Sequence, residues 1–308
     1  MFRPARCRHA LLLLISVLPL SGCLFRSRKV EQLPPLQLKT ASAQELIDYV
    51  NSQAGRIQTL QATVDISTSV GGEKKGKVTE YESIRGYVLV RKPEMLRMIG
   101  LMPIVRNRAF DMVSDGRDFK LWIPPKNRFI VGRNDIETRN AAQPLENVRP
   151  QHIYDALLLR HIDQRNEIAV MENDTGSITD NKGRKVVQAE YVLDIVQTGA
   201  HPFLSRKIIF SRIDLLPHRQ LLYDAEGNVQ TIASYENYKT DVDVNFPWKI
   251  EINRPQEEWD ITLTVLKLDL NEPLPNDKFV LEQPPGVEVV NLDKAQSSAA
   301  DKPAESNQ

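Results

Sequence analysis

The sequence predicts an α+β domain in which a strongly curved antiparallel sheet packs over two helices. Three observations predict this fold class: many segments alternate apolar and polar residues, turn-forming residues separate them at short spacing, and only two stretches have helical periodicity. No stretch within 42–290 is long or polar enough to link two separate units, so we expect one domain there.

The two helices are expected at the start and in the middle of this domain. Ser42 is a suitable N-cap, and Glu45 three residues later completes the capping-box pattern. Apolar residues then follow at helical spacing. The second helix is expected over 149–162, where Pro150 suits the first turn and apolar residues again recur with helical period.

The remaining segments have the period of two that is typical of half-buried strands. The acidic, glycine-containing run at 224–228 predicts a hairpin turn between two of them. The expected strands cover 60–66, 78–90, 96–99, 109–113, 119–123, 128–131, 168–171, 185–196, 203–213, 218–223, 229–239, 248–253 and 259–269.

The N-terminus has the pattern of a signal peptide over 1–22. Three arginines and no acid precede an apolar run at 10–20, which is too short to serve as a comfortable membrane-spanning anchor. The residues Leu-Ser-Gly-Cys at 20–23 resemble the lipobox of bacterial lipoproteins, which implies cleavage before Cys23 and lipidation of its thiol. The alternative is an ordinary signal peptide with an incidental cysteine.

Lipidation of Cys23 with acyl chains such as palmitate would anchor the protein stably, because more than one chain is attached. Leu24 follows, and in many Gram-negative bacteria a residue other than Asp there directs a lipoprotein to the outer membrane, facing the periplasm. We expect a tether over 23–41, and the polar residues 291–308 predict a disordered tail.

The composition and motifs argue against several classes of function. The chain has 40 basic and 40 acidic residues, so it lacks the positive charge of a nucleic-acid binder. It contains no His-Glu-x-x-His, Gly-x-Ser-x-Gly or phosphate-binding glycine-rich motif. Asp111, Asp115 and Asp118 are closely spaced, but they do not match an EF-hand loop, and a tight turn is the simpler interpretation. We therefore expect no enzyme, metal or cofactor.

Five short motifs, in their order along the chain, resemble the LolA/LolB-like lipoprotein-carrier superfamily. The resemblance covers most of 42–290 and implies an unclosed half-barrel, capped by helices, whose cavity binds acyl chains. The motifs are Gly-Tyr-Val-Leu-Val-Arg-Lys-Pro at 86–93, Val-Ser-Asp-Gly at 113–116, Asn-Glu-Pro-Leu-Pro at 271–275, Phe-Val-Leu-Glu at 279–282 and Pro-Pro-Gly-Val at 284–287.

One position departs from the carrier pattern. Lys92 precedes the proline where LolA has a functional arginine, and lysine is not an equivalent fork-shaped donor. Arg91 does not replace it, because strand alternation directs Arg91 to the other face of the sheet. The role of that arginine is therefore not assigned to this chain.

An acyl-binding site needs a dry, apolar concavity and gains about 0.8 kcal/mol per buried methylene. Apolar residues of the expected strands are candidates to line it, with a filled core as the open alternative for each of them. The candidates are Leu96, Met98, Met112, Leu121, Ile123, Ile208, Phe210, Ile250 and Ile252.

The run Gly-Leu-Met-Pro-Ile-Val at 100–105 is unusually apolar for a loop between two strands. LolB carries a protruding apolar loop in a comparable place, which contacts the membrane. We therefore expect Leu101, Met102 and Ile104 to enter lipid, with Arg106 and Arg108 at the headgroups. The alternative is a loop that folds against the helices.

The sequence thus favours a membrane-anchored lipoprotein that binds lipid or lipoprotein acyl chains and transfers or receives them at the outer membrane. The alternative is an envelope interaction or assembly lipoprotein with a filled core and a protein partner. A hydrolase built from scattered carboxylates is a third interpretation. Cargo, partner and oligomeric state are not specified by the sequence.

Overall fold

The computed structural model describes residues 37–72, 76–135, 148–179, 183, 185–241 and 243–293. The expected signal peptide, Cys23 and most of the expected tether lie outside the described residues, as does the expected tail beyond residue 293. None of the helices in the described ranges is long and apolar enough to cross a membrane.

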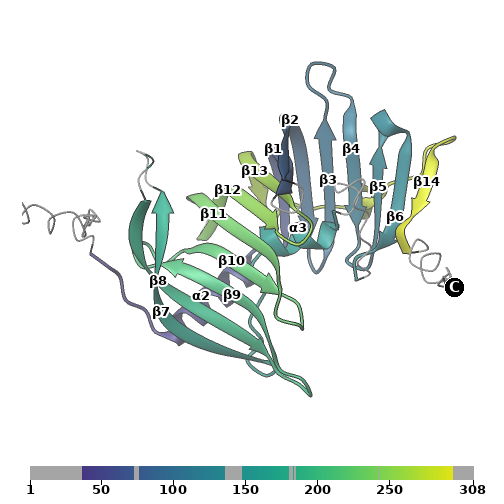
Figure 1. The fold of residues 1–308 in the computed structure, drawn as a ribbon. Coiled ribbons are helices and arrows are strands. Elements are labelled where there is room, and N and C mark those ends of the chain that lie inside the picture. The colour runs from purple at the N-terminus through teal and green to yellow at the C-terminus, as the bar shows by residue number, and fades with distance from the viewer. Residues whose placement is uncertain are drawn as a thin grey trace, which may run out of the picture.

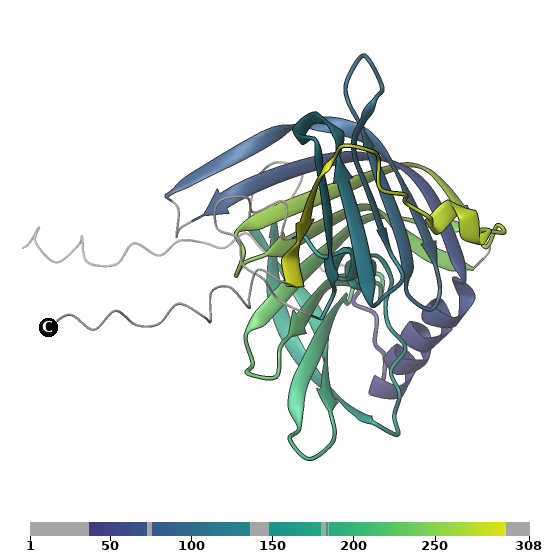
Figure 2. The same ribbon diagram turned by 90° about the vertical axis from the view of Figure 1, so that its right-hand side faces the viewer.

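All strands of the described chain form one sheet with the order β14-β6-β5-β4-β3-β2-β1-β13-β12-β11-β10-β9-β8-β7 (Figure 1). Neighbours are antiparallel except β14 and β6, which are parallel. The sheet is strongly curved and unclosed (Figure 2), so the expected fold class is confirmed. The strands are β1 (Thr59–Gly72), β2 (Lys77–Arg91), β3 (Met95–Leu101), β4 (Arg108–Ser114), β5 (Asp118–Ile123), β6 (Arg128–Arg133), β7 (Glu167–Thr179), β8 (Lys185–Gln197), β9 (Phe203–Ser211), β10 (Pro217–Tyr223), β11 (Val229–Asp241), β12 (Val244–Arg254), β13 (Trp259–Leu270) and β14 (Glu288–Asn291).

Helix α2 (Ala43–Arg56) begins with the expected capping box. The Glu45 backbone N–H donates to Ser42 Oγ at 3.3 Å, and the Ser42 backbone N–H donates to Glu45 Oε2 at 2.7 Å. These two bonds satisfy backbone donors that a helix start otherwise leaves unpaired. The buried face of α2 packs against strands β8 and β9 in a cluster that contains Leu46, Val50 and Phe210.

Helix α3 (Pro150–Leu157) is shorter than the expected 149–162. The chain becomes extended at Leu158, which is buried in the main core cluster, whereas Ile162 is buried in the cluster beneath α2. Asn51 supplies the hydrogen bonds that the extended segment needs, because its side chain bonds both the N–H and the carbonyl of Ile162, at 2.7 and 3.2 Å. Helix α3 therefore ends early because the segment that follows it must place Leu158 in one cluster and Ile162 in the other.

The concave face of the sheet carries these two apolar clusters. The larger one lies under α3 and contains Ile153, Leu121 and Ile250, and the smaller one lies under α2. Each helix therefore covers its own part of the concave face (Figure 1).

The convex face is crossed by residues 271–287, which we call the strap (Figure 2). Arg91 donates to the strap carbonyl of Leu274 at 2.6 Å, so its side chain lies on the convex face, as alternation predicted. The strap leads into β14, which sequence patterning did not predict. The packed chain continues past residue 291, because Leu292 is only 3% exposed.

Candidate functional site

An apolar cavity of about 220 Å³ lies between the concave face of the sheet and α3. Among the described residues that line it, two have polar side chains, Thr68 and Lys126. An apolar wall of this kind suits apolar ligands. The remaining lining residues are Ile66, Met98, Ala109, Phe110, Met112, Leu121, Ile123, Val148, Ile153 and Ile261.

The structure brings four of the nine candidate residues together at this cavity: Met98, Met112, Leu121 and Ile123. Leu96, Ile250 and Ile252 belong to the same core cluster without lining the cavity. Ile208 and Phe210 lie in the other cluster, beneath α2, where they pack as core. The proposed lining set therefore divides between two places.

None of the other eight lining residues was among the candidates from the sequence. Ile66 and Ile261 had the alternation of inward-facing residues, which was the available signal. The Phe110 ring packs closely over Gly100 of β3, which has no side chain, because a Cβ there would lie 2.4 Å from the ring. Val148 and Ile153 reach the cavity only through the placement of α3, which local patterns do not encode.

Residues 102–107 form a hairpin loop that joins β3 to β4 and projects beyond the sheet (Figure 1). The Met102 N–H donates to the Asn107 carbonyl at 2.7 Å, and the Arg106 N–H donates to the Met102 carbonyl at 3.1 Å. The loop is closed by its own backbone and does not fold against the helices.

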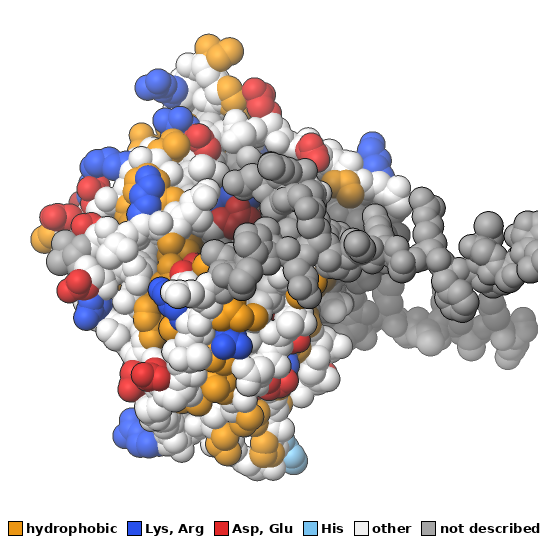
Figure 3. Space-filling view, turned by 90° about the vertical axis from the view of Figure 1, so that its left-hand side faces the viewer, with side chains coloured by type: hydrophobic (Ala, Val, Ile, Leu, Met, Phe, Trp, Pro, Cys, Tyr) orange, Lys and Arg blue, Asp and Glu red, His pale blue; other side chains and the backbone are white. Residues whose placement is uncertain are grey.

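The tip of this hairpin exposes apolar side chains. Ile104 is 99% exposed, Val105 64% and Met102 37%. Hydrophobic side chains are visible on the projection at the top of the space-filling view (Figure 3). Ile104 also has a φ of 67°, a left-handed conformation that is unfavourable for a β-branched residue. Exposure and backbone strain together mark this residue as unusual for a surface that faces only water.

The other residues proposed for membrane contact lie differently. Leu101 is the last residue of β3 and is half-buried, and Arg106 is exposed on the loop with a φ of 54°. Arg108 contacts its own strand: Nη1 lies 3.1 Å from Asp111 Oδ2, and the guanidinium lies over the Trp122 ring at 5.8 Å. Arg106 is therefore the more available of the two cations.

The cavity and the hairpin lie at the same end of the sheet. Ala109 and Phe110, which line the cavity, come directly after Arg108 at the base of the hairpin. Lys126, in the turn between β5 and β6, closes the cavity wall at this end.

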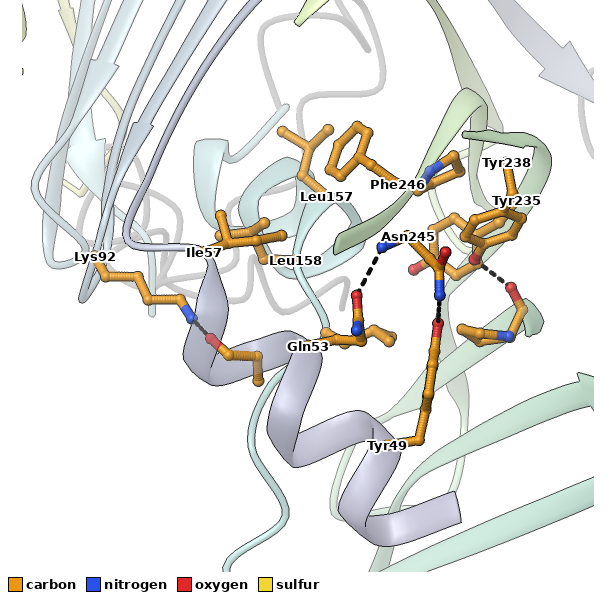
Figure 4. A pocket seen from close by; sticks show the side chains of 14 residues that line it. Tyr49, Gln53, Ile57, Lys92, Leu157, Leu158, Tyr235, Tyr238, Asn245 and Phe246 are labelled. Carbon is orange, nitrogen blue, oxygen red and sulfur yellow. Dashed lines mark hydrogen bonds between the residues drawn. The ribbon is translucent and has the colours of Figure 1, made fainter. Parts of the chain in front are cut away.

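At the other end of the sheet, Lys92 holds the end of α2 (Figure 4). Its Nζ donates to the Ala54 carbonyl, where a cation also complements the helix dipole. Burial lowers the pKa of the Lys92 ammonium. Gln53 Oε1 accepts the Asn245 N–H at 2.9 Å, so α2 is also bound to β12. The space left between α2 and β11–β12 is about 30 Å³, which is too small for an acyl chain.

A polar groove of about 890 Å³ lies beside this end of α2, between α3 and the turns that follow β2 and β4. Ionisable side chains of both signs line it, including Glu94, Asp155 and Arg160. Burial raises the pKa of Asp155, which accepts a hydrogen bond from Gln151 on the same helix at 3.1 Å. Within the described ranges, no group of three or more His, Cys, Asp or Glu residues could hold a metal ion.

Comparisons with known proteins give similarity at the level of fold. No family model and no curated protein matches the sequence. The fold is similar to that of LolA superfamily protein NE2245 from Nitrosomonas europaea, with 16% identity, a TM-score of 0.46 and coverage of 79% of this chain and 99% of that one. The fold is also similar to that of a putative outer membrane lipoprotein-sorting protein domain from Vibrio parahaemolyticus, with 13% identity and a TM-score of 0.46. That match covers 77% of this chain and 97% of the other. A DUF1329 family protein from Desulfovibrio piger is 14% identical, with a TM-score of 0.47 and coverage of 77% of this chain and 95% of that one.

Proposed function

We propose that this protein is a membrane-anchored lipoprotein that binds acyl chains of lipids or lipoproteins and transfers or receives them at the outer membrane. The observation that carries the proposal is the placement of an apolar cavity at the end of the sheet from which the apolar hairpin projects. Insertion of Ile104 and Val105 into a bilayer would bring the cavity to its ligand, and no covalent chemistry is required.

The lining suits an acyl chain energetically. Eight methylenes transferred from water would contribute about 6 kcal/mol, at roughly 0.8 kcal/mol each. Met98 of β3 and Met112 of β4 lie directly opposite each other as a cross-strand pair in the cavity wall. Methionine side chains are flexible and adapt to irregular ligands, so this wall could widen from its present volume.

The anchor would keep the hairpin near the membrane. If Cys23 carries lipid, thirteen residues (24–36) separate it from residue 37, where the described chain begins. These could span at most about 50 Å when extended. Leu24 after the cysteine favours the outer membrane as the place of anchoring.

The proposal is tested by titrating fluorescent palmitate into the chain from residue 24 onward. We expect saturable binding with one site. Ala109→Phe places a ring in the cavity and should weaken binding at least tenfold, whereas Val280→Phe places the same ring on the convex strap and should leave binding unchanged. Equal binding by the wild type and folded Ala109→Phe protein, or no saturable binding, would contradict the proposal.

A further inference from the structure

The two edge regions of the sheet differ in whether another strand covers them. One edge, β6, is covered over residues 128–131 by the short parallel strand β14. The other edge is β7, which pairs with β8 alone among the described residues. It runs in continuous register from Glu167 to Thr179. A long uncovered edge strand is a template for another strand.

β7 lacks several of the devices that block such pairing. Its sequence, Glu-Ile-Ala-Val-Met-Glu-Asn-Asp-Thr-Gly-Ser-Ile-Thr, contains no lysine, arginine or proline, and its pairing with β8 shows no bulge. Ile168 and Val170 on its convex side are 56% and 51% exposed. Apolar side chains therefore flank the open edge without cover from the described chain.

The backbone groups that face the open edge can be identified from the ladder. The Thr198 N–H donates to the Asn166 carbonyl at 2.9 Å, which makes this opposed pair a hydrogen-bonded one. Hydrogen-bonded and non-hydrogen-bonded pairs alternate along an antiparallel ladder. The N–H and carbonyl groups of Ala169, Met171 and Asn173 therefore point away from β8, toward the open edge.

The side chains near this edge favour a basic partner. On the convex face, Glu172, Asp174, Glu190 and Asp194 lie on β7 and β8. Among the described side chains, two cations face these four acids: Lys207 Nζ lies 3.0 Å from Asp194 and 3.9 Å from Glu172, and Arg219 lies 3.7 Å from Glu190. Within this described set, the acids therefore exceed the cations by two.

We propose that β7 binds an extended segment of a partner protein by strand addition, and that this segment is basic at its first half and apolar at its second. In an antiparallel partner, basic residues on the convex face would lie opposite Asp174 and Glu172, and apolar residues would then lie opposite Val170 and Ile168. The outward backbone groups supply affinity, and the side-chain order supplies specificity.

A second copy of this chain fits the edge less well. Antiparallel self-pairing centred on Asn173 would place Glu172 opposite Asp174 of the other copy, and like charges directly opposite are destabilising. Pairing centred on Val170 would place Ile168 opposite Glu172. A basic segment avoids both conflicts.

The test uses the chain from residue 24 onward and a labelled eight-residue peptide whose alternate residues are Lys, Arg, Val and Ile. We expect fluorescence anisotropy to show binding that weakens with salt, and a peptide with Glu in place of Lys and Arg to bind at least tenfold more weakly. Ala169→Pro removes one outward N–H and leaves the β8 ladder intact, so it should abolish binding, whereas Ala169→Ser should retain it.

Hydrogen exchange provides a second measurement that does not depend on how Ala169→Pro folds. Addition of the peptide to the wild-type protein should slow exchange at the Ala169 and Met171 amides. Unchanged exchange at both amides, or equal binding of the acidic peptide, would overturn the proposal. A dimer in sedimentation experiments that Ala169→Pro dissociates would identify a second copy as the occupant and overturn the basic-partner assignment.

Discussion

Arg97 and Asp111 form a two-bond ion pair on the convex face, with Nε–Oδ1 and Nη2–Oδ2 distances of 3.0 and 2.8 Å. The Asp111 side chain is fully buried. The third donor, Arg97 Nη1, bonds the Lys278 carbonyl at 2.8 Å, so the same guanidinium fixes the strap to β3. One residue therefore couples a buried charge to the position of the C-terminal segment.

Replacing this arginine should destabilise the protein substantially. Arg97→Met leaves Asp111 with Arg108 alone, and breaking a buried pair typically costs about 3–5 kcal/mol. We expect a loss of about 3 kcal/mol in the free energy of unfolding, measured with urea. The control is Arg85→Met, which breaks the exposed pair with Asp65 and should cost about 1 kcal/mol or less. Similar losses in the free energy of unfolding for both variants would show that the buried contacts of Arg97 with Asp111 and the strap stabilise the protein no more than an exposed ion pair does.

The pH dependence of stability should report His152. Burial holds the pKa of this imidazole well below its usual value, and the positive charges of Arg254 and Arg149 lower it further. The folded state therefore keeps His152 neutral, whereas the unfolded chain binds a proton as pH falls below about 6.5. The free energy of unfolding should fall as pH decreases from this value, by up to about 1.4 kcal/mol per pH unit from this residue.

Urea unfolding of His152→Gln between pH 6.5 and 5 measures this contribution. The variant should lose less stability over this range than the wild type. The control is His201→Gln, which removes an exposed imidazole. An unchanged slope in His152→Gln would assign the pH dependence to other groups.

Isoleucine truncation should distinguish core from cavity wall. Ile208 is fully buried in the cluster beneath α2, and Ile208→Ala should cost about 2–5 kcal/mol. Ile123 borders the cavity and already lacks packing partners on that side, so Ile123→Ala should cost less than about 2 kcal/mol. The midpoints of urea denaturation give both values. A larger loss at Ile123 would mean that its environment is close-packed.

The hairpin should control binding to membranes. Burying an isoleucine side chain contributes about 1.5–3 kcal/mol, so Ile104→Glu should reduce liposome binding of the chain without Cys23 by roughly tenfold to a hundredfold. Val280→Glu adds the same charge at a position that is also exposed, on the strap, and should have little effect. Flotation with phosphatidylglycerol-containing liposomes measures both. Binding by Ile104→Glu at the wild-type level would contradict membrane contact by the hairpin.

Local chemistry made much of the fold predictable. The capping box of Ser42 and Glu45 involves four consecutive residues, and alternation along a strand identifies the inward side chains. The apolar run at 100–105 similarly indicated an exposed hairpin. These signals all act within a few residues of one another.

Features that depend on distant partners were not predictable. β14 has four residues, too few to show alternation, and it exists because the strap delivers it to β6. Alternation placed both Met112 and Phe210 inward, but the helices α3 and α2 decide which one borders a cavity. Arg108 was expected to lie at lipid headgroups, and its contact with Asp111 depends on the burial of that carboxylate by Arg97.

The most direct test of the central claim is native mass spectrometry of the chain from residue 24 onward, purified from a bacterial periplasm. If the cavity binds acyl chains, we expect stoichiometric adducts that organic solvent extracts as lipid and that are lost in Ala109→Phe. Their masses would identify the class of cargo. A clean mass without adducts, and no uptake of added phospholipid or acylated peptide, would contradict acyl-chain binding.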